Sequence, residues 1–416
     1  MNRMKPYKTL ILASSGAGLE WFDFTIYILL AHYISQVFFP ESTPIVALLK
    51  TFGTFAIGYL ARPIGGIVFG HIADRHGRKY AFTTAVFTMA IATLFIGFIP
   101  SFNSIGVWAP TLLVLLRLVQ GFSVGGEIPS ATVFTLEHFN KKHAGFAVGI
   151  IFMSITFGNA LASLLGWVLT HIFHHAQMLA WGWRIAFYCG FVLGIASYFL
   201  RKKALETPAF QQLVEQQAIR KLPIMHLLKT FKTKLFIGIG LAVIIAAGIF
   251  TFLYLPTYAV NFLHYQHNEI FLAATIFFTL TGLLCPVFGF LSDCIGRKKQ
   301  LLVGTLVCIV VGFFLFHALI HHARFMPWGF AIGMAIIFAI NNSIYALMIA
   351  ETFKTNIRTS GLGFCYNIAF AVFGGLAPLL ITFLIHETQN VFLPYYYFLG
   401  CAILTLVAAM CYKKCD

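Results

Sequence analysis

The chain has 416 residues, of which 59% are hydrophobic, 16% are aromatic and 10% are charged. Soluble domains average about 45–50% apolar and about 25% charged residues, so this composition excludes a soluble globular protein, and the aromatic content excludes intrinsic disorder. The net charge of +15 would suggest a nucleic-acid partner in a soluble protein. Here we expect a polytopic membrane protein that contacts the lipid bilayer and has no nucleic-acid partner.

Uninterrupted apolar segments of the length that a helix needs to cross a bilayer, about 20 residues, recur along the chain. They lack the alternating pattern of barrel strands. In chain order we expect six spans at 9–38, 44–70, 80–100, 109–136, 144–172 and 183–200. Six more are expected at 236–260, 268–291, 300–320, 326–350, 359–385 and 391–412.

This spacing predicts an all-α polytopic fold with 12 transmembrane helices in two pseudo-symmetric six-helix halves. We place the N-terminal half at 1–200, a cytoplasmic linker at 201–235 and the C-terminal half at 236–416. With the N-terminus inside, most of the 28 Lys and Arg residues fall in cytoplasmic segments, as the positive-inside rule requires. We therefore expect a multi-pass protein of the bacterial inner membrane with both termini cytoplasmic.

Histidines show the opposite bias, because most of the 15 lie near the outer ends of the spans. A metal site or a pH sensor is one explanation. Ordinary polar residues at the membrane interface are the other. We assign no metal ligand to them.

A ten-residue pattern occurs twice. Residues 70–79 read GHIADRHGRK and residues 289–298 read GFLSDCIGRK, each after the second span of its half. Two such copies indicate a duplicated architecture. A glutamate also ends the fourth span of each half, at Glu137 and Glu351.

These repeated residues suit a cytoplasmic gate. Glycine lets helices close tightly across a short turn, the aspartates can lie near helix N-termini, and the arginines can reach the glutamates. The alternative is a rigid turn that carries positive-inside charges. The expected gate residues are Gly70, Asp74, Gly77, Arg78, Glu137, Gly289, Asp293, Gly296, Arg297 and Glu351.

Further motifs carry a resemblance to a known family. They read GLEWFDF at 18–24, ARPIGG at 61–66, RLVQGFSVGGE at 117–127, GWRI at 182–185 and GLGFCYN at 361–367. With the duplicated pattern, they resemble the major facilitator superfamily and, within it, the metabolite:proton symporters, which include proline/betaine, α-ketoglutarate, citrate and shikimate permeases. The resemblance implies a proton-coupled symporter that imports a small carboxylate-bearing metabolite, such as a di- or tricarboxylate, an amino acid or a betaine, by alternating access.

Ionisable side chains inside a membrane are costly and usually face a cavity or a partner. We expect proton coupling to involve Glu20, Asp23, Arg117 and Glu127, all within the first and fourth spans. Movement of a guanidinium between carboxylate partners can load and release a proton. A static network of ion pairs that holds the helices together is the alternative.

The expected substrate-binding residues come from both halves. They are Arg62, Arg117, Asn341, Tyr345, Tyr366 and Asn367. The guanidiniums suit a carboxylate, and the tyrosine faces suit a cationic head group. Single Tyr or Asn residues in spans also serve as hydrogen bonds between helices, which is the competing explanation.

Other functions are open on this evidence. The same fold can export a metabolite or a siderophore, and a non-transporting membrane sensor is the alternative from another class. An enzyme is not expected, because the chain has no HExxH and no carboxylate-rich metal motif. We assign no catalytic residue, no metal and no cofactor, and we expect a monomer whose partners are a small metabolite and the proton.

Overall fold

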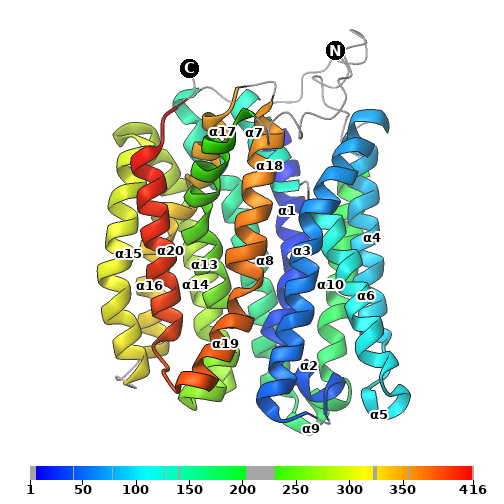
Figure 1. Ribbon diagram of the computed structural model, residues 1–416. Helices are drawn as coiled ribbons and strands as arrows, with labels where there is room; N and C mark the ends of the chain where they lie inside the picture. The colour runs from blue at the N-terminus through cyan, green and yellow to red at the C-terminus, as the bar shows by residue number, and fades with distance from the viewer. Residues whose placement is uncertain are drawn as a thin grey trace.

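The computed structural model describes residues 6–40, 42–76, 78–125, 127–138, 141–202, 230–321, 326–354 and 357–414. Across these ranges the chain is helical and forms no strand (Figure 1). Long helices run roughly parallel along the molecule. The first helix begins and the last helix ends at the same end, which we call the terminal end (Figure 1).

The N-terminal half contains α1 (Pro6–Leu29), α2 (Ala31–Phe38), α3 (Pro44–His76), α4 (Arg78–Phe98), α5 (Phe102–Ile105), α6 (Trp108–Val124), α7 (Glu127–His138), η1 (Lys141–His143), α8 (Ala144–Ile172), α9 (His175–Gln177), η2 (Met178–Gly182) and α10 (Trp183–Lys202). The C-terminal half contains α13 (Lys232–Leu263), α14 (His267–Ile295), α15 (Arg297–Ile320), α16 (Met326–Asn342), α17 (Tyr345–Thr352), α18 (Arg358–Ala369), η4 (Phe370–Gly375), α19 (Ala377–Thr388) and α20 (Leu393–Cys411).

Length and hydropathy mark most of these elements as membrane spans. In the part of the chain that the structure describes, nine helices are long and apolar enough to cross a bilayer, and Thr83–Phe98 and Trp108–Val124 are shorter apolar helices. The predicted all-α, two-half architecture is confirmed. The exact bounds of the halves and linker stay predictions, since residues 203–229 lie outside the described ranges.

Several predicted single spans are interrupted helices. The first breaks at Leu30 between α1 and α2, and the tenth breaks between α16 and α17. Near the second break, the Gln300 amide donates to the Ile340 carbonyl at 3.0 Å. A backbone break at membrane depth requires such partners, because no water satisfies the freed groups.

The eleventh pass contains a π-helical turn, η4, between α18 and α19. Its last two residues, Gly374 and Gly375, lie against the rings of Phe250 and Tyr59, one from each half. A Cβ on Gly375 would lie 2.5 Å from Tyr59 Cβ. The turn therefore brings this pass into close contact with both α3 and α13.

The halves meet most closely along α8 and α14. Gly145 and Gly289 face each other so tightly that a Cβ on either would collide with the backbone carbonyl of the other. Small residues allow such approach of two helix backbones. This contact lies where α8 begins and α14 nears its end, and thus on the terminal side of the molecule.

Candidate transport site and gate

Arg62 of α3 lies fully inside the protein, 1% exposed, at the contact between the halves. Its guanidinium carbon lies 4.8 Å from the Tyr59 ring centroid, 5.6 Å from that of Trp21 and 5.8 Å from that of Tyr366 in α18. Among the described residues, Nε and Nη1 have no hydrogen-bond partner. Two donors of a buried cation are therefore available to an anionic group.

Arg117 of α6 has a similar aromatic environment. Its guanidinium carbon lies 4.2 Å from the Tyr27 ring centroid and 4.5 Å from that of Phe24. Nη1 donates to Gln120 Oε1 at 2.8 Å, whereas Nε and Nη2 have no partner. Aromatic faces attract the guanidinium and offset part of the cost of its burial.

Asp23 of α1 is 1% exposed and connects to Arg117 through two neutral residues. Thr93 of α4 donates from Oγ1 to Asp23 Oδ2 at 3.3 Å. Gln120 Nε2 in turn donates to Thr93 Oγ1 at 2.7 Å. The result is a line from Arg117 through Gln120 and Thr93 to Asp23, which we call the relay.

In the relay, two neutral residues stand between Arg117 and Asp23. Among the described side chains, no carboxylate lies within ion-pair distance of Arg62 or Arg117. The reason is local, since Gln120 lies one turn along α6 and occupies the position next to the guanidinium. Glu20 and Glu127 belong to α1 and α7, but their side chains lie outside the described part of the structure.

The expected substrate residues of the C-terminal half separate into two groups. Tyr366 and Tyr345 lie near the half contact, the first beside Arg62 and the second 5.1 Å, centroid to centroid, from Phe152 of α8. Asn341 instead packs inside its own half, where its amide donates to Cys308 Sγ of α15 at 3.6 Å. The structure thus places Asn341 against a neighbouring helix and not beside Arg62.

Asn367 joins the halves directly. Its amide donates to the Gly125 carbonyl of the N-terminal half at 2.6 Å and to the Gly363 carbonyl of its own helix at 2.9 Å. Its Oδ1 has no partner. In this conformation Asn367 acts as a contact that holds the halves together.

The second copy of the duplicated pattern forms a charged cluster at the terminal end. Asp293 of α14 accepts hydrogen bonds from the backbone N–H groups of Gly145 at 3.0 Å and Phe146 at 3.2 Å. These groups open α8, so the carboxylate caps a helix of the other half. A carboxylate at a helix N-terminus is favourable for both charge and hydrogen bonding.

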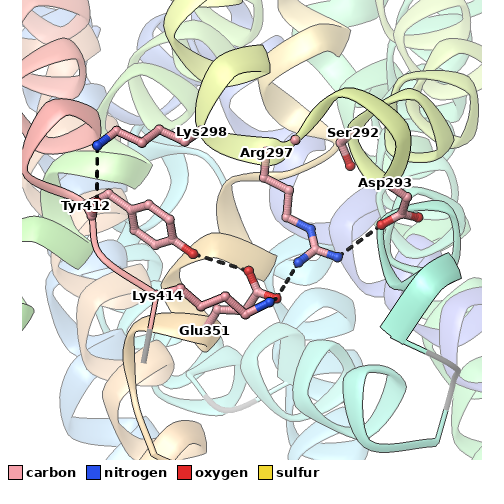
Figure 2. Close-up of a pocket in the computed structure, with 8 residues that line it drawn as sticks. Ser292, Asp293, Arg297, Lys298, Glu351, Tyr412 and Lys414 are labelled. Carbon is pink, nitrogen blue, oxygen red and sulfur yellow. Dashed lines mark hydrogen bonds and ion pairs between the residues drawn. The ribbon is translucent and has the colours of Figure 1, made fainter. Parts of the chain in front are cut away.

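Figure 2 shows Arg297 between Asp293 and Glu351. Its Nη2 bonds Asp293 at 3.0 Å, and its Nη1 forms an ion pair with Glu351 of α17. Two residues after α20 add to this arrangement. Tyr412 donates its hydroxyl to Glu351 at 3.2 Å, and Lys414 Nζ lies 3.0 Å from the same carboxylate.

Gly289 and Gly296 complete this copy. Gly289 makes the close contact with Gly145. Gly296 has a φ of +93°, a conformation that glycine adopts without strain, and it lets α15 begin directly after α14. For the first copy, Gly77 lies outside the described part of the structure. The same is true of the surroundings of Gly70 and of the side chains of Asp74, Arg78 and Glu137.

At the opposite end, imidazoles join the halves. The His32 ring of α2 lies 4.9 Å from the His267 ring of α14 and 5.9 Å from that of His175. Ser163 of α8 also donates to the Phe271 carbonyl at 2.8 Å. Contacts between the halves are therefore present at both ends and beside Arg62.

With this geometry in view, similarity to known proteins is informative. The model of the Major Facilitator Superfamily matches residues 13–378 and 263–415. The chain belongs to the major facilitator superfamily.

Relatives in this superfamily span nearly the whole chain. The proline/betaine transporter of Escherichia coli (strain K12) is 32% identical over 419 residues, which cover 98% of this chain and 83% of the relative. The glycine betaine/proline/ectoine/pipecolic acid transporter OusA of Dickeya dadantii is also 32% identical, with 98% and 83% covered. A putative proline/betaine transporter of Staphylococcus haemolyticus is 34% identical, with 96% and 86% covered.

Solved structures agree on the fold. The partially occluded inward-open xylose transporter XylE from E. coli aligns with a TM-score of 0.77 at 17% identity, covering 97% of this chain and 96% of that one. The chain is thus a polytopic membrane transporter of the major facilitator fold and not an enzyme. The resemblance expected from the sequence motifs is confirmed.

Sequence reasoning missed several site residues of this major facilitator protein. Gln120 stands inside the RLVQG motif, but its contacts with Arg117 and Thr93 carry no sequence signal beyond that position. Thr93 belongs to an ordinary apolar span. Tyr412 and Lys414 follow α20. From the sequence, Lys414 is one of the positive-inside charges, and Tyr412 has no assigned role.

Proposed function

We propose that this transporter imports a small zwitterion of the betaine or proline class together with protons. The observation that carries the proposal is the environment of Arg62, a buried cation with two unpartnered donors and aromatic rings from both halves around it. The printed names of relatives at 32–34% identity support the same class of substrate.

The chemistry of such a site is complementary to a zwitterion. The substrate carboxylate accepts hydrogen bonds from Arg62 Nε and Nη1, and the planar guanidinium suits it in a bidentate arrangement. The cationic head group packs on the faces of Trp21, Tyr59 and Tyr366, because ring quadrupoles attract ammonium groups. Since these residues come from both halves, the bound substrate stabilises the closed arrangement of the site.

Proton coupling is assigned to the N-terminal half. Asp23 is a buried carboxylate among the helices of the N-terminal half. The described buried carboxylates of the C-terminal half are Asp293 and Glu351, and both belong to the cluster at the terminal end. A carboxylate enclosed by protein favours the neutral state unless a partner stabilises its charge. Asp23 therefore takes up the proton that accompanies the substrate.

Alternating access requires the contacts at one end to separate while those at the other persist. At the terminal end these are the Asp293 cap on α8 and the Asn367 bond to Gly125. At the opposite end they are the His32 and His267 rings and the bond from Ser163 to Phe271. We assign the gate role to the terminal cluster.

A dicarboxylate is the second candidate substrate. Arg62 and Arg117 are both buried with unpartnered donors, and two guanidiniums suit a dianion. This alternative predicts that both arginines contribute to affinity for one substrate. The zwitterion proposal assigns affinity to Arg62 and coupling to Arg117.

We place the protein as a monomer in the bacterial inner membrane, with both termini and the linker at 201–235 in the cytoplasm and with no nucleic-acid partner. Positive-inside charge supports this orientation. The contacts at the terminal end then form the cytoplasmic gate.

Reconstitution in proteoliposomes tests the function. Radiolabelled glycine betaine or proline should accumulate under an inward proton gradient, and a protonophore should abolish that accumulation. Unlabelled α-ketoglutarate and citrate should compete poorly. Strong competition by dicarboxylates, or uptake that follows sodium and ignores the protonophore, would contradict the proposal.

A further inference from the structure

The directions of two hydrogen bonds in the relay, from Arg117 to Gln120 and from Gln120 to Thr93, are determined by chemistry. A guanidinium can only donate, so the amide oxygen of Gln120 must face Arg117. The amide nitrogen of Gln120 then faces Thr93 Oγ1 and donates to it. Donors therefore point from Arg117 toward Thr93, and the Thr93 hydroxyl completes the line when it donates to Asp23.

Thr93 is the one member of the relay whose proton has two acceptors. Oγ1 lies 3.3 Å from Asp23 Oδ2 and 3.0 Å from the Met89 carbonyl of its own helix. A hydroxyl carries a single proton and rotates to suit its partners. An ionised Asp23 attracts that proton, because a charged acceptor forms the stronger bond, whereas a protonated Asp23 releases it to Met89.

Among the described residues, Thr93 is the side chain that donates a hydrogen bond to Asp23. Oδ1 is buried and has no hydrogen-bond partner among the residues that the structure describes. Gly190 and Gly194 of α10 face the carboxylate, and a Cβ on Gly194 would lie 3.3 Å from Oδ2. Asp23 is therefore enclosed by a face of α10 that offers no side-chain donor at these positions.

Charged groups reach this region from few elements. Within four residues of Asp23 on α1, the other ionisable groups are Tyr27 and Glu20, and the Glu20 side chain is outside the described part. The neighbouring helices α3 and α6 contribute Arg62 and Arg117, and α4 contributes Thr93. Of these helices, the one that joins a charged group to Asp23 by described hydrogen bonds is α6, through Gln120 and Thr93.

We propose that Thr93 and Gln120 are positioning residues that transmit the protonation state of Asp23 to the Arg117 guanidinium. The inference rests on the proposed proton coupling and names the residues that connect Asp23 to Arg117. With Asp23 ionised, the Thr93 proton points to it, Oγ1 accepts firmly from Gln120, and Arg117 is held against Gln120. With Asp23 protonated, the line loses its charged acceptor and Arg117 is released.

No proton moves along the relay. The transported proton binds the Asp23 carboxylate from one side of the membrane and leaves it to the other. Thr93 rotates its own hydroxyl proton between two acceptors, and Gln120 and Arg117 keep all of theirs. The relay therefore carries information about charge and not the proton itself.

Two variants test the relay in proteoliposomes. Thr93→Val keeps the shape of the side chain and removes the hydroxyl. Gln120→Glu gives Arg117 a direct carboxylate partner and replaces the donor at Thr93 with an acceptor. Two assays are run on each: accumulation driven by an inward proton gradient, and exchange of labelled for unlabelled substrate without a gradient.

Both variants should exchange substrate within about twofold of the parent and lose at least about tenfold in proton-driven accumulation. Thr93→Ser should restore accumulation, because it restores the hydroxyl. Thr88→Val is the matched control, since Thr88 lies on the same helix and bonds the Thr84 carbonyl at 2.8 Å outside the relay. It should behave like the parent in both assays.

Parent-like accumulation in Thr93→Val overturns the relay and leaves the proposed function intact. An equal loss of exchange and accumulation in a folded Thr93→Val protein also overturns it, because that pattern reflects packing. If Thr93→Val does not fold, the same criteria apply to Gln120→Glu. A parent that exchanges substrate but never accumulates it with protons contradicts both the coupling and the relay.

Discussion

The two halves of this transporter bury different polar chemistry between their helices. In the N-terminal half, Arg62, Arg117 and Asp23 are at most 1% exposed and keep donors or acceptors unpartnered. In the C-terminal half, Asn341 and Asn342 donate to the thiols Cys308 and Cys285. Of the described carboxylates of that half, Asp293 and Glu351 lie in the terminal cluster, and Glu269 and Glu387 lie at the opposite helix ends.

This difference separates two tasks. Buried charges are costly and are retained in membrane proteins where they bind or couple ions and substrates. Amide contacts with a neighbouring helix stabilise packing and do not change charge during a transport cycle. In our proposal, the N-terminal half therefore carries binding and coupling, and the C-terminal half supplies aromatic surface and the charged cluster at the terminal end.

The largest effect is expected at Arg62. Arg62→Gln removes the cation that we assign to the substrate carboxylate. Two charge-assisted hydrogen bonds contribute about 1.5–3 kcal/mol each, so affinity should fall at least about 100-fold. Isothermal titration calorimetry with glycine betaine measures the change.

Arg184→Gln is the matched control for that experiment. Arg184 donates to the Gly97 carbonyl at 2.6 Å, between α10 and the end of α4, and does not contact the Arg62 rings in the described structure. Its substitution should leave affinity within about threefold of the parent. If Arg184→Gln lowers affinity as strongly as Arg62→Gln, the loss reflects folding and the assigned division between the halves fails.

An intermediate effect is expected at Asp293. Asp293→Asn weakens the cap on α8 and the pair with Arg297, at a cost of about 1–3 kcal/mol to the closed terminal end. A cysteine at position 363 reports opening, since a Cβ on Gly363 lies 3.7 Å from Pro129 of the other half. Its rate of maleimide labelling should rise about fivefold or more.

The background for this labelling replaces Cys189, Cys294, Cys411 and Cys415 with serine. Glu387→Gln serves as the control, because Glu387 is an exposed carboxylate beside His386 on α19. It should not change the labelling rate. Unchanged labelling in Asp293→Asn would show that the cap is a static turn contact.

The smallest effect is expected at Tyr412. Tyr412→Phe removes one hydrogen bond to Glu351, about 0.5–1.5 kcal/mol, and should raise the same labelling rate by about two- to twelvefold. Burial and the Glu351 carboxylate both raise the pKa of the Tyr412 hydroxyl. Because the folded pKa lies above the ordinary value near 10, the hydroxyl stays a donor and the effect should be constant from about pH 6 to 9. A steep pH dependence over that range would contradict this assignment.

Hydropathy and the duplicated pattern were enough to predict the helical fold, its two halves and three residues of the terminal cluster, Asp293, Arg297 and Glu351, but not Tyr412 or Lys414. The break at Leu30 was not predictable, because apolar sequence runs through it. The break between α16 and α17 follows the polar residues Asn341 and Asn342, but these residues alone do not predict a break. Their stability depends on partners distant in sequence, such as Gln300 at the second break.

The pairing of buried side chains also could not be predicted from the sequence. Charge alone favours a direct pair between Arg117 and Asp23. In the fold, Gln120 occupies the position beside Arg117, and Thr93 of another helix occupies the position beside Asp23. Which neutral residue stands between two charges depends on helix rotation, and periodicity does not determine it to within one side chain.

Helix rotation also explains the structural role of the π turn in the eleventh pass. Tyr366 and Thr382 are sixteen residues apart, and at about 100° per residue a regular helix would point them roughly 160° from each other. A π turn accommodates one additional residue, which reduces this angle to about 60°. Tyr366 therefore faces Arg62 while Thr382 bonds the Tyr254 hydroxyl at 2.8 Å. The π turn η4 thus changes the rotation of α19 relative to α18. As a result, residues on both helices of the eleventh pass face the interior.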